Sequence, residues 1–282
     1  MSIKKIGLII YNTIPKNVKN YLGEIKWLKP LRDSLFRSKG RYKEVETIIK
    51  RSYQNYDVEF KLLSSFRVSA KAANRGIETK LLNRSIVLLN KFKPHHDDLT
   101  VLDVGANFAF LSLVWANTIA KNGQTIAFEP SINLVSTINK SIKLNNLQTR
   151  LVVENNAVGN ENKEVELFIS NSTSNVLDVK GSDVIQKIEM ITLDAYIDKT
   201  ELKRCDLLKI DVDGIELDIL QGAVKLIKQF KPILIVETNE NIKIIDYIKN
   251  LDYTILGIDL NELTETNPLP LNVFCIPNEA YL

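Results

Sequence analysis

The chain has 282 residues, enough for one large domain or for one domain with an appendage. Its 45% hydrophobic and 25% charged residues are ordinary for a soluble globular protein, and no apolar run reaches the ~18 residues that span a bilayer, which excludes a membrane-spanning protein. The net charge of +3 is unevenly divided, with +12 on residues 1–100 and −9 on residues 101–282.

The basic amino-terminal third is compatible with an anionic partner such as nucleic acid, a nucleotide-sugar or lipid headgroups. Its lysines are spread out, however, which favours solvated helices over a dedicated binding patch. The apolar run Ile6–Ile10 is too short for a signal-peptide core. Cys205 and Cys275 lack metal-like spacing, so we predict buried thiols and a cytoplasmic location.

Residues 1–98 have mainly helical patterns, and we predict a helical basic extension over 1–75 followed by a ligand-binding domain over 76–282. From residue 99 onward, apolar strands alternate with amphipathic helices, as in a parallel sheet covered on both faces. The predicted strands are 99–106, 124–130, 150–158, 163–169, 206–212, 231–237, 253–258 and 272–276. The predicted helices are 108–121, 131–145 with Ser131 as its cap, 193–199, 214–229 and 241–251, and the polar stretch Ser170–Asn175 is a predicted loop.

Polar or acidic residues stand at five consecutive predicted strand ends. In open α/β sheets the ligand binds beyond the carboxyl ends of the strands, so these residues are expected to share one ligand. They are Asp103, Glu129, Asn156, the pair Asp211 and Asp213, and Glu237.

The turn after the first of these strands, in VLDVGANFAF (101–110), has a single glycine. Read from Gly105, the later glycine positions of a dinucleotide fingerprint hold Asn107 and Phe110, so a diphosphate would fit poorly and an NAD-type oxidoreductase is the least favoured class. Asp103 suits a cation instead. S-adenosylmethionine offers a sulfonium, an amino group, a carboxylate and a ribose diol without any phosphate, and it is the predicted ligand.

Glu129 lies 26 residues after Asp103, at the end of the next strand, where a carboxylate can accept both ribose hydroxyls. Asn156 and Ala157 would border the adenine ring. Ordinary structural roles compete with these assignments, since Glu129 precedes Pro130 in a turn and an Asn-Asn turn needs no ligand.

Six ordered motifs resemble the FkbM family, a group of class I S-adenosylmethionine-dependent methyltransferases that act mostly on hydroxyl oxygens. They are DVGAN (103–107), AFEP (127–130), NNAVG (155–159), ITLDAY (191–196), LLKIDVDGIELDILQGA (207–223) and PILIVE (232–237). The resemblance covers roughly residues 75–240. It implies a Rossmann-like α/β fold with a mostly parallel seven-stranded sheet and helices on both faces, here with the helical amino-terminal extension.

The stretch Gly76-Ile-Glu78 resembles a short element of the family that approaches the cofactor. The predicted cofactor-binding set is Glu78, Asp103, Gly105, Ala106, Asn107, Phe108, Glu129, Pro130, Asn156 and Ala157. The family usually has glycine where this chain has Ala109, and the methyl group there would tighten the approach of helix and cofactor.

For an alcohol acceptor the protein should position the hydroxyl and take up its proton. Asp211, Asp213 and Glu237 are the predicted catalytic residues, because close carboxylates raise one another's pKa. A helix-capping role competes for Asp213. The oxygens of Asp211, Glu237 and Asn239 would suit Mg²⁺, as at similar strand ends in catechol-type O-methyltransferases, but we predict no metal.

We predict O-methylation of a small molecule, sugar or glycan, with the Ser170–Asn175 loop over the acceptor pocket. The IDVDG turn lacks the Asn/Asp-Pro-Pro-aromatic pattern of base N-methyltransferases. A ribose 2′-O-methyltransferase acting on nucleic acid stays open, although it needs lysines near the hydroxyl and Lys209 is expected to lie along a buried strand. A cofactor-binding module without catalysis also stays open.

Overall fold

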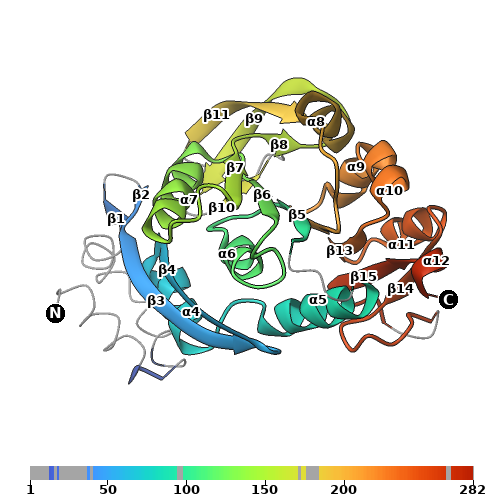
Figure 1. Ribbon diagram of the computed structural model, residues 1–282. Coiled ribbons are helices and arrows are strands. Elements are labelled where there is room, and N and C mark those ends of the chain that lie inside the picture. The colour runs from blue at the N-terminus through green and yellow to red at the C-terminus, as the bar shows by residue number, and fades with distance from the viewer. Residues whose placement is uncertain are drawn as a thin grey trace.

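The computed structural model describes residues 13–15, 18, 37–38, 41–93, 98–170, 173–175, 184–264 and 268–281. A seven-stranded sheet forms the centre of the molecule (Figure 1). Its strand order is β14–β15–β13–β12–β5–β6–β7, and only β15 runs antiparallel to its neighbours among these seven described strands. The predicted Rossmann-like α/β fold with a mostly parallel seven-stranded sheet is therefore confirmed.

The strands of this sheet are short and rich in Val, Ile and Leu, as expected for strands that are buried on both faces. In chain order they are β5 (Thr100–Val104), β6 (Gln124–Phe128), β7 (Leu151–Glu154), β12 (Leu207–Ile210), β13 (Ile233–Glu237), β14 (Tyr253–Leu256) and β15 (Asn272–Pro277). The helices are α4 (Phe66–Asn74), α5 (Thr79–Phe92), α6 (Phe110–Ala116), α7 (Ile132–Leu144), α8 (Leu193–Thr200), α9 (Glu216–Gln221), α10 (Val224–Phe230), α11 (Ile242–Lys249) and α12 (Asn278–Tyr281).

Successive residues of each strand enter different cores, because side chains alternate across a sheet. Val101 of β5 packs in the core shared with α5, α6 and α7, whereas Leu102 packs in the core shared with α8 to α11. Helices thus cover both faces. The strand order reverses between β5 and β12, which is where an open α/β sheet forms a crevice beyond its carboxyl edge.

The expectation of a helical amino-terminal extension is wrong for residues 44–65. They form a two-stranded antiparallel hairpin, β3 (Glu44–Tyr53) and β4 (Tyr56–Ser65), that lies beside α6 and α7 in Figure 1. Burial alternates along most of the hairpin, whose buried apolar residues include Val45, Ile49, Val58 and Leu62. Phe60, also buried, meets the ring of Phe110 edge to face at 5.8 Å between centroids. Most of residues 1–40 lie outside the described residues, and the boundary at residue 75 stays a prediction.

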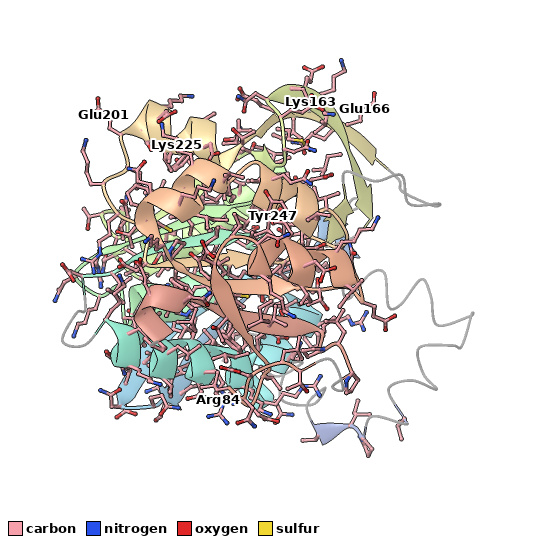
Figure 2. The ribbon with its side chains drawn as sticks, turned by 90° about the vertical axis from the view of Figure 1, so that its right-hand side faces the viewer. Arg84, Lys163, Glu166, Glu201, Lys225 and Tyr247 are labelled. Carbon is pink, nitrogen blue, oxygen red and sulfur yellow. The ribbon has the colours of Figure 1, made fainter. Side chains whose placement is uncertain are left out.

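The predicted strand 150–158 is two strands that belong to different sheets. After β7 comes the two-residue strand β8 (Ala157–Val158), which belongs to a second sheet. The other strands of this sheet are β9 (Lys163–Ser170), β10 (Thr173–Asn175) and β11 (Val184–Ile191), in the order β10–β9–β11–β8. In Figure 2, Lys163 and Glu166 of this sheet lie at the opposite end of the molecule from Arg84 of α5. The predicted loop over 170–175 is therefore largely strand, with Ser170 ending β9 and residues 171–172 outside the described residues.

Two expected helices differ in detail from the structure. The predicted helix 214–229 is two helices with a break at residues 222–223. A β-carbon on Gly222 would lie 2.1 Å from the carbonyl oxygen of Gly159, so a larger residue would not fit there. Ser131 stands at the start of α7, but its side chain makes no capping hydrogen bond. Among the residues described, no helix combines the length and apolarity needed to cross a membrane.

Two short strands precede the hairpin. They are β1 (Arg37–Ser38) and β2 (Arg41–Tyr42) and pair with each other. Tyr42 reaches α7, where its hydroxyl lies 2.7 Å from the Thr137 hydroxyl, and its ring contacts Phe108 edge to face at 5.1 Å between centroids. The segment just before the hairpin is thereby attached to the turn that follows β5.

Candidate functional site

The turn after β5 is built around Gly105. This residue has a φ of +79°, and a β-carbon on it would lie 1.9 Å from the carbonyl oxygen of Asp211, so only glycine fits. Asn107 and Ala109 also have positive φ, at 53° and 54°. The left-handed positions are therefore 105, 107 and 109, not 105, 107 and 110 as the dinucleotide pattern suggested, and Phe110 is the first residue of α6.

Glu129 anchors this turn from the end of the neighbouring strand β6. Its side chain is 3% exposed, and its two carboxylate oxygens accept hydrogen bonds from the backbone N–H groups of Asn107 and Ser131, each at 2.9 Å. Asn155 holds the next segment by donating to the carbonyl oxygens of Glu129 and Pro130. Glu129 thus fixes the two turns that border the crevice, in addition to facing it.

A pocket opens at this edge of the sheet, at the reversal of strand order between β5 and β12. Both apolar side chains and carboxylates line it. The lining residues are Val104, Gly105, Asn107, Phe128, Glu129, Pro130, Leu134, Asn156, Ala157, Val158, Leu167, Asp211, Val212, Asp213 and Ile215. This set contains no Lys, Arg or His among the residues that the structure describes.

A second turn, after β12, carries Asp211 and Asp213. It is held by Glu216, which is 1% exposed and accepts hydrogen bonds from the backbone N–H groups of Val212 at 3.3 Å and Gly214 at 3.0 Å. Asn239 donates to the same carboxylate at 2.9 Å. Asp213 does not cap a helix, because α9 begins at Glu216 and its N-cap position is Ile215.

Two carboxyl groups around this turn, those of Asp213 and Glu237, have raised pKa values. Burial, followed by the charges of Asp211 and Glu216, raises the pKa of Asp213 above its usual range. Burial and the adjacent Asp211, to which it is hydrogen-bonded, raise the pKa of Glu237 to about 8. Glu237 therefore carries a proton at neutral pH and shares it with Asp211.

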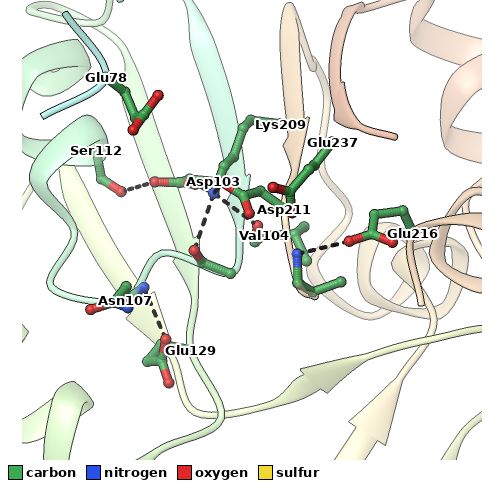
Figure 3. Close-up of polar contacts among 12 residues, drawn as sticks. Glu78, Asp103, Val104, Asn107, Ser112, Glu129, Lys209, Asp211, Glu216 and Glu237 are labelled. Atoms are coloured by element: carbon green, nitrogen blue, oxygen red, sulfur yellow. Dashed lines mark hydrogen bonds and ion pairs between the residues drawn. The ribbon is translucent and has the colours of Figure 1, made fainter. Parts of the chain in front are cut away.

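Lys209 belongs to β12 and lies beneath the turn after β5 and the turn after β12, with 3% exposure (Figure 3). Its ammonium is 3.1 Å from Asp103 Oδ1 and 3.5 Å from Asp211 Oδ2. Burial lowers the pKa of Lys209, but the two carboxylates raise it by more, so the net shift is upward and the side chain is charged. Because it is buried and bonded, Lys209 does not reach a ligand in the pocket as a nucleic-acid 2′-O-methyltransferase would require.

Most of the predicted site residues meet at the pocket. Gly105, Asn107, Glu129, Pro130, Asn156, Ala157, Asp211 and Asp213 line it. Five others lie outside the lining: Glu78, Asp103, Ala106, Phe108 and Glu237.

Each of these five has an observed place. Asp103 is buried between Lys209 and Ser112, Ala106 and Phe108 are buried in the turn, and Glu237 is hydrogen-bonded to Asp211. In Figure 3 the carboxylate of Glu78 points toward Ser112 and Asp103.

Sequence reasoning missed Glu216 as the anchor of the second turn and the apolar lining residues Leu134, Leu167 and Ile215. The position of Glu216, two residues after a glycine at the start of a helix, was the available signal. No group of three or more His, Cys, Asp or Glu side chains among the described residues is arranged to hold a metal ion.

Comparison with known proteins places the chain among methyltransferases. The model of the methyltransferase FkbM domain matches residues 103–255. Methyltransferase 1 of Beauveria bassiana is 23% identical over 188 residues, which are 58% of this chain and 74% of that protein.

Two of the solved structures that resemble the chain do so at low sequence identity. Methyltransferase FkbM from Methylobacillus flagellatus has 14% identity and a TM-score of 0.45, with 74% of this chain aligned to 65% of that one. The O-methyltransferase from Bacillus cereus in complex with SAH has 12% identity and a TM-score of 0.43, with 74% of this chain aligned to 85% of that one. The chain thus spans just under two thirds of the Methylobacillus protein.

Proposed function

The chain belongs to the FkbM family of methyltransferases, and from that premise we propose that it transfers a methyl group from S-adenosylmethionine to a hydroxyl oxygen of a small molecule, sugar or glycan. The observation that carries the proposal is the composition of the pocket. Carboxylates and apolar groups line it at the reversal of strand order, without a basic side chain among the described residues. Such a lining attracts a cation and repels phosphate.

The residues present fit the parts of this donor. Glu129 would take the ribose diol, since its carboxylate lines the pocket just after β6 and carboxylate oxygens accept hydrogen bonds from hydroxyl groups. Apolar groups of Ala157, Val158 and Leu167 would border the adenine. Asp211 and Asp213 would face the amino group and the sulfonium charge.

When bound, the donor supplies an activated methyl group, and the remaining work is positioning and proton uptake. The acceptor hydroxyl would lie against Asp211 and Asp213, where its O–H bond breaks as the new O–CH₃ bond forms and the S–CH₃ bond breaks. The proton passes to the carboxylate of Asp213, whose pKa is raised by burial and by the charges of Asp211 and Glu216, which makes it a better base than a free aspartate. Glu237 already carries a proton at neutral pH and holds Asp211 beside Asp213 through their hydrogen bond.

The absence of basic side chains from the described lining also bears on the acceptor. A nucleic-acid acceptor brings phosphates, which need cationic contacts. A neutral polyhydroxylated acceptor can instead donate hydrogen bonds to the carboxylates. We therefore favour a small-molecule or carbohydrate acceptor over nucleic acid.

Isothermal titration of the protein with S-adenosylhomocysteine and with NAD tests the proposal. We expect the homocysteine compound to bind and NAD not to bind. Glu129→Ala should weaken S-adenosylhomocysteine binding at least tenfold, because two buried hydrogen bonds to the ribose are lost. Glu154→Ala, which removes a carboxylate at the end of the next strand but outside the pocket, is the matched control. Tight NAD binding, or equal losses in the two variants, would contradict the proposal.

A further inference from the structure

The ammonium group of Lys209 joins four oxygen atoms from two neighbouring strands. Besides the two carboxylates, it donates hydrogen bonds to the carbonyl oxygens of Val104 at 3.3 Å and Gly105 at 3.1 Å. Lys209 and Asp103 are register partners on β12 and β5, so their side chains lie on the same face of the sheet. One buried cation therefore contacts both the turn after β5 and a carboxylate on the turn after β12.

The connection continues into the helix layer. Asp103, 1% exposed, accepts a hydrogen bond from the Ser112 hydroxyl of α6 at 2.5 Å through its other oxygen. Figure 3 shows the resulting line of side chains, Ser112, Asp103, Lys209 and Asp211, running from α6 to the edge of the pocket. Asp211, at its outer end, has a side chain that is 38% exposed.

Stability alone is a weak reason for this arrangement. A buried ion pair loses its hydration, and well-packed apolar residues of similar volume often stabilise a core equally well or better. What apolar residues cannot do is fix the orientation of a carboxylate at a pocket. The line also ends at a close backbone contact, because Gly105 packs directly against the carbonyl of Asp211.

We propose that Lys209 is a positioning residue that holds the Asp211 carboxylate toward the sulfonium of the methyl donor and ties it to the Gly105 turn. The inference rests on the proposed function, since it concerns the same site. It assigns to Lys209 an action through Asp211 and through the backbone of the turn, without contact to donor or acceptor.

Binding of the charged donor and of its uncharged product separates this role from a structural one. S-adenosylmethionine carries the sulfonium charge and S-adenosylhomocysteine does not, so a carboxylate aimed at the sulfur favours the donor alone. Asp211→Asn should therefore weaken S-adenosylmethionine about 3–10-fold more than S-adenosylhomocysteine, the effect of one partly exposed charge pair.

The test variant is Lys209→Met combined with Asp103→Asn, which removes the buried cation and one buried anion together and leaves the net charge unchanged. Titration calorimetry of this variant should show the same selective loss of S-adenosylmethionine as Asp211→Asn. Adding Asp211→Asn to this variant should weaken S-adenosylmethionine binding little further, because a carboxylate that is no longer held toward the sulfonium contributes little to affinity. If the double variant does not fold, Ser112→Ala replaces it as a milder change at the inner end of the line. Ser112→Ala should weaken S-adenosylmethionine binding about twofold more than S-adenosylhomocysteine binding.

A matched control removes an ion pair at the other end of the same strand. Arg204 and Asp206 lie 2.5 Å apart just before β12, and Asp206 is 3% exposed. Arg204→Met with Asp206→Asn should lower the melting temperature without changing the preference for donor over product. The inference would be overturned if the Lys209 variant bound both ligands equally more weakly. It would also be overturned if the fold-losses in S-adenosylmethionine affinity of the Lys209 variant and of Asp211→Asn multiplied in the combined variant. Failure of the unmodified protein to bind either ligand would overturn the proposed function itself.

Discussion

The turns after β5 and β12 are each held by a glutamate side chain, but the two glutamates come from different places in the chain. In each, a buried carboxylate accepts backbone N–H groups that no strand or helix satisfies: Glu129 for the Gly105 turn and Glu216 for the Asp211–Gly214 turn. Glu129 comes from a neighbouring strand and also lines the pocket. Glu216 comes from the helix that follows its own turn and lies outside the lining.

The difference indicates how the two sides of the pocket divide the work. The first turn is a fixed backbone cradle with few side chains directed at the ligand. The second turn carries the carboxylates and places them beside Glu237, so it holds charge that a ligand or a proton must balance. Changes at the first turn should therefore act on folding and cofactor affinity, and changes at the second on charge and pH dependence.

The largest effect is expected at Gly105. Gly105→Ala places a methyl group against the backbone of Asp211 at a positive φ, so the second turn must move, and we expect a loss of about 3–5 kcal/mol in the free energy of unfolding. Urea denaturation measures it. Gly257→Ala is the control, since the nearest atom to its β-carbon is 3.9 Å away and its stability should change by less than about 0.5 kcal/mol. Similar results for the two variants would remove the idea of a fixed cradle.

The two glutamates give the next effect. Glu129→Ala and Glu216→Ala each remove a buried carboxylate that accepts two backbone N–H groups, and each should cost about 2–4 kcal/mol of unfolding free energy. Only Glu129→Ala should also lose S-adenosylhomocysteine binding by tenfold or more. Glu216→Ala, titrated at a temperature where it is folded, should weaken binding by less than about threefold. A larger loss in Glu216→Ala would mean that the second turn, too, cradles the ligand.

The smallest effect concerns the pH dependence of stability. The pKa of Glu237 is about 8 in the folded protein against 4.5 when unperturbed, so its stabilising contribution is complete below about pH 4.5 and is lost as the pH rises through about 8. Glu237→Gln stays neutral, and should therefore melt about 2–4 °C above the unmodified protein at pH 9 but close to it at pH 5. Melting curves of Asp246→Asn, which removes an exposed carboxylate of α11, should show no such pH-dependent gain.

Much of the sheet is predictable from sequence because its strands are buried on both faces and read as continuous apolar runs. The β3–β4 hairpin carried a signal too, the alternation of Val45, Thr47 and Ile49 before the turn at Gln54 and Asn55. Ile48 interrupts that alternation, and the charged residues on either side are also typical of a solvated helix. The close approach of Gly222 to the Gly159 carbonyl, just after β8, was not predictable from local pattern, because it joins segments 63 residues apart in the chain.

The candidate site divides in the same way. Residues at strand ends, such as Glu129 and Asp211, could be found because parallel strands bring their carboxyl ends to one edge. The partners of Lys209 depend on the register between β5 and β12, and the role of Glu216 depends on the path of a turn. Neither the register between two strands nor the path of a turn can be predicted from the pattern of residue types along the chain.

The β4 edge is bonded directly to α7, through Asn145 to both backbone groups of Lys61 and through Ser141 to the N–H of Leu63. The same helix contributes Leu134 to the pocket. A shortened chain beginning at residue 76 would lose this seam and bare the apolar flank of α6 and α7, so recombinant versions trimmed to the region of family similarity should aggregate. Cleavage within the hairpin should likewise loosen α7, and with it the wall of the pocket formed by Leu134.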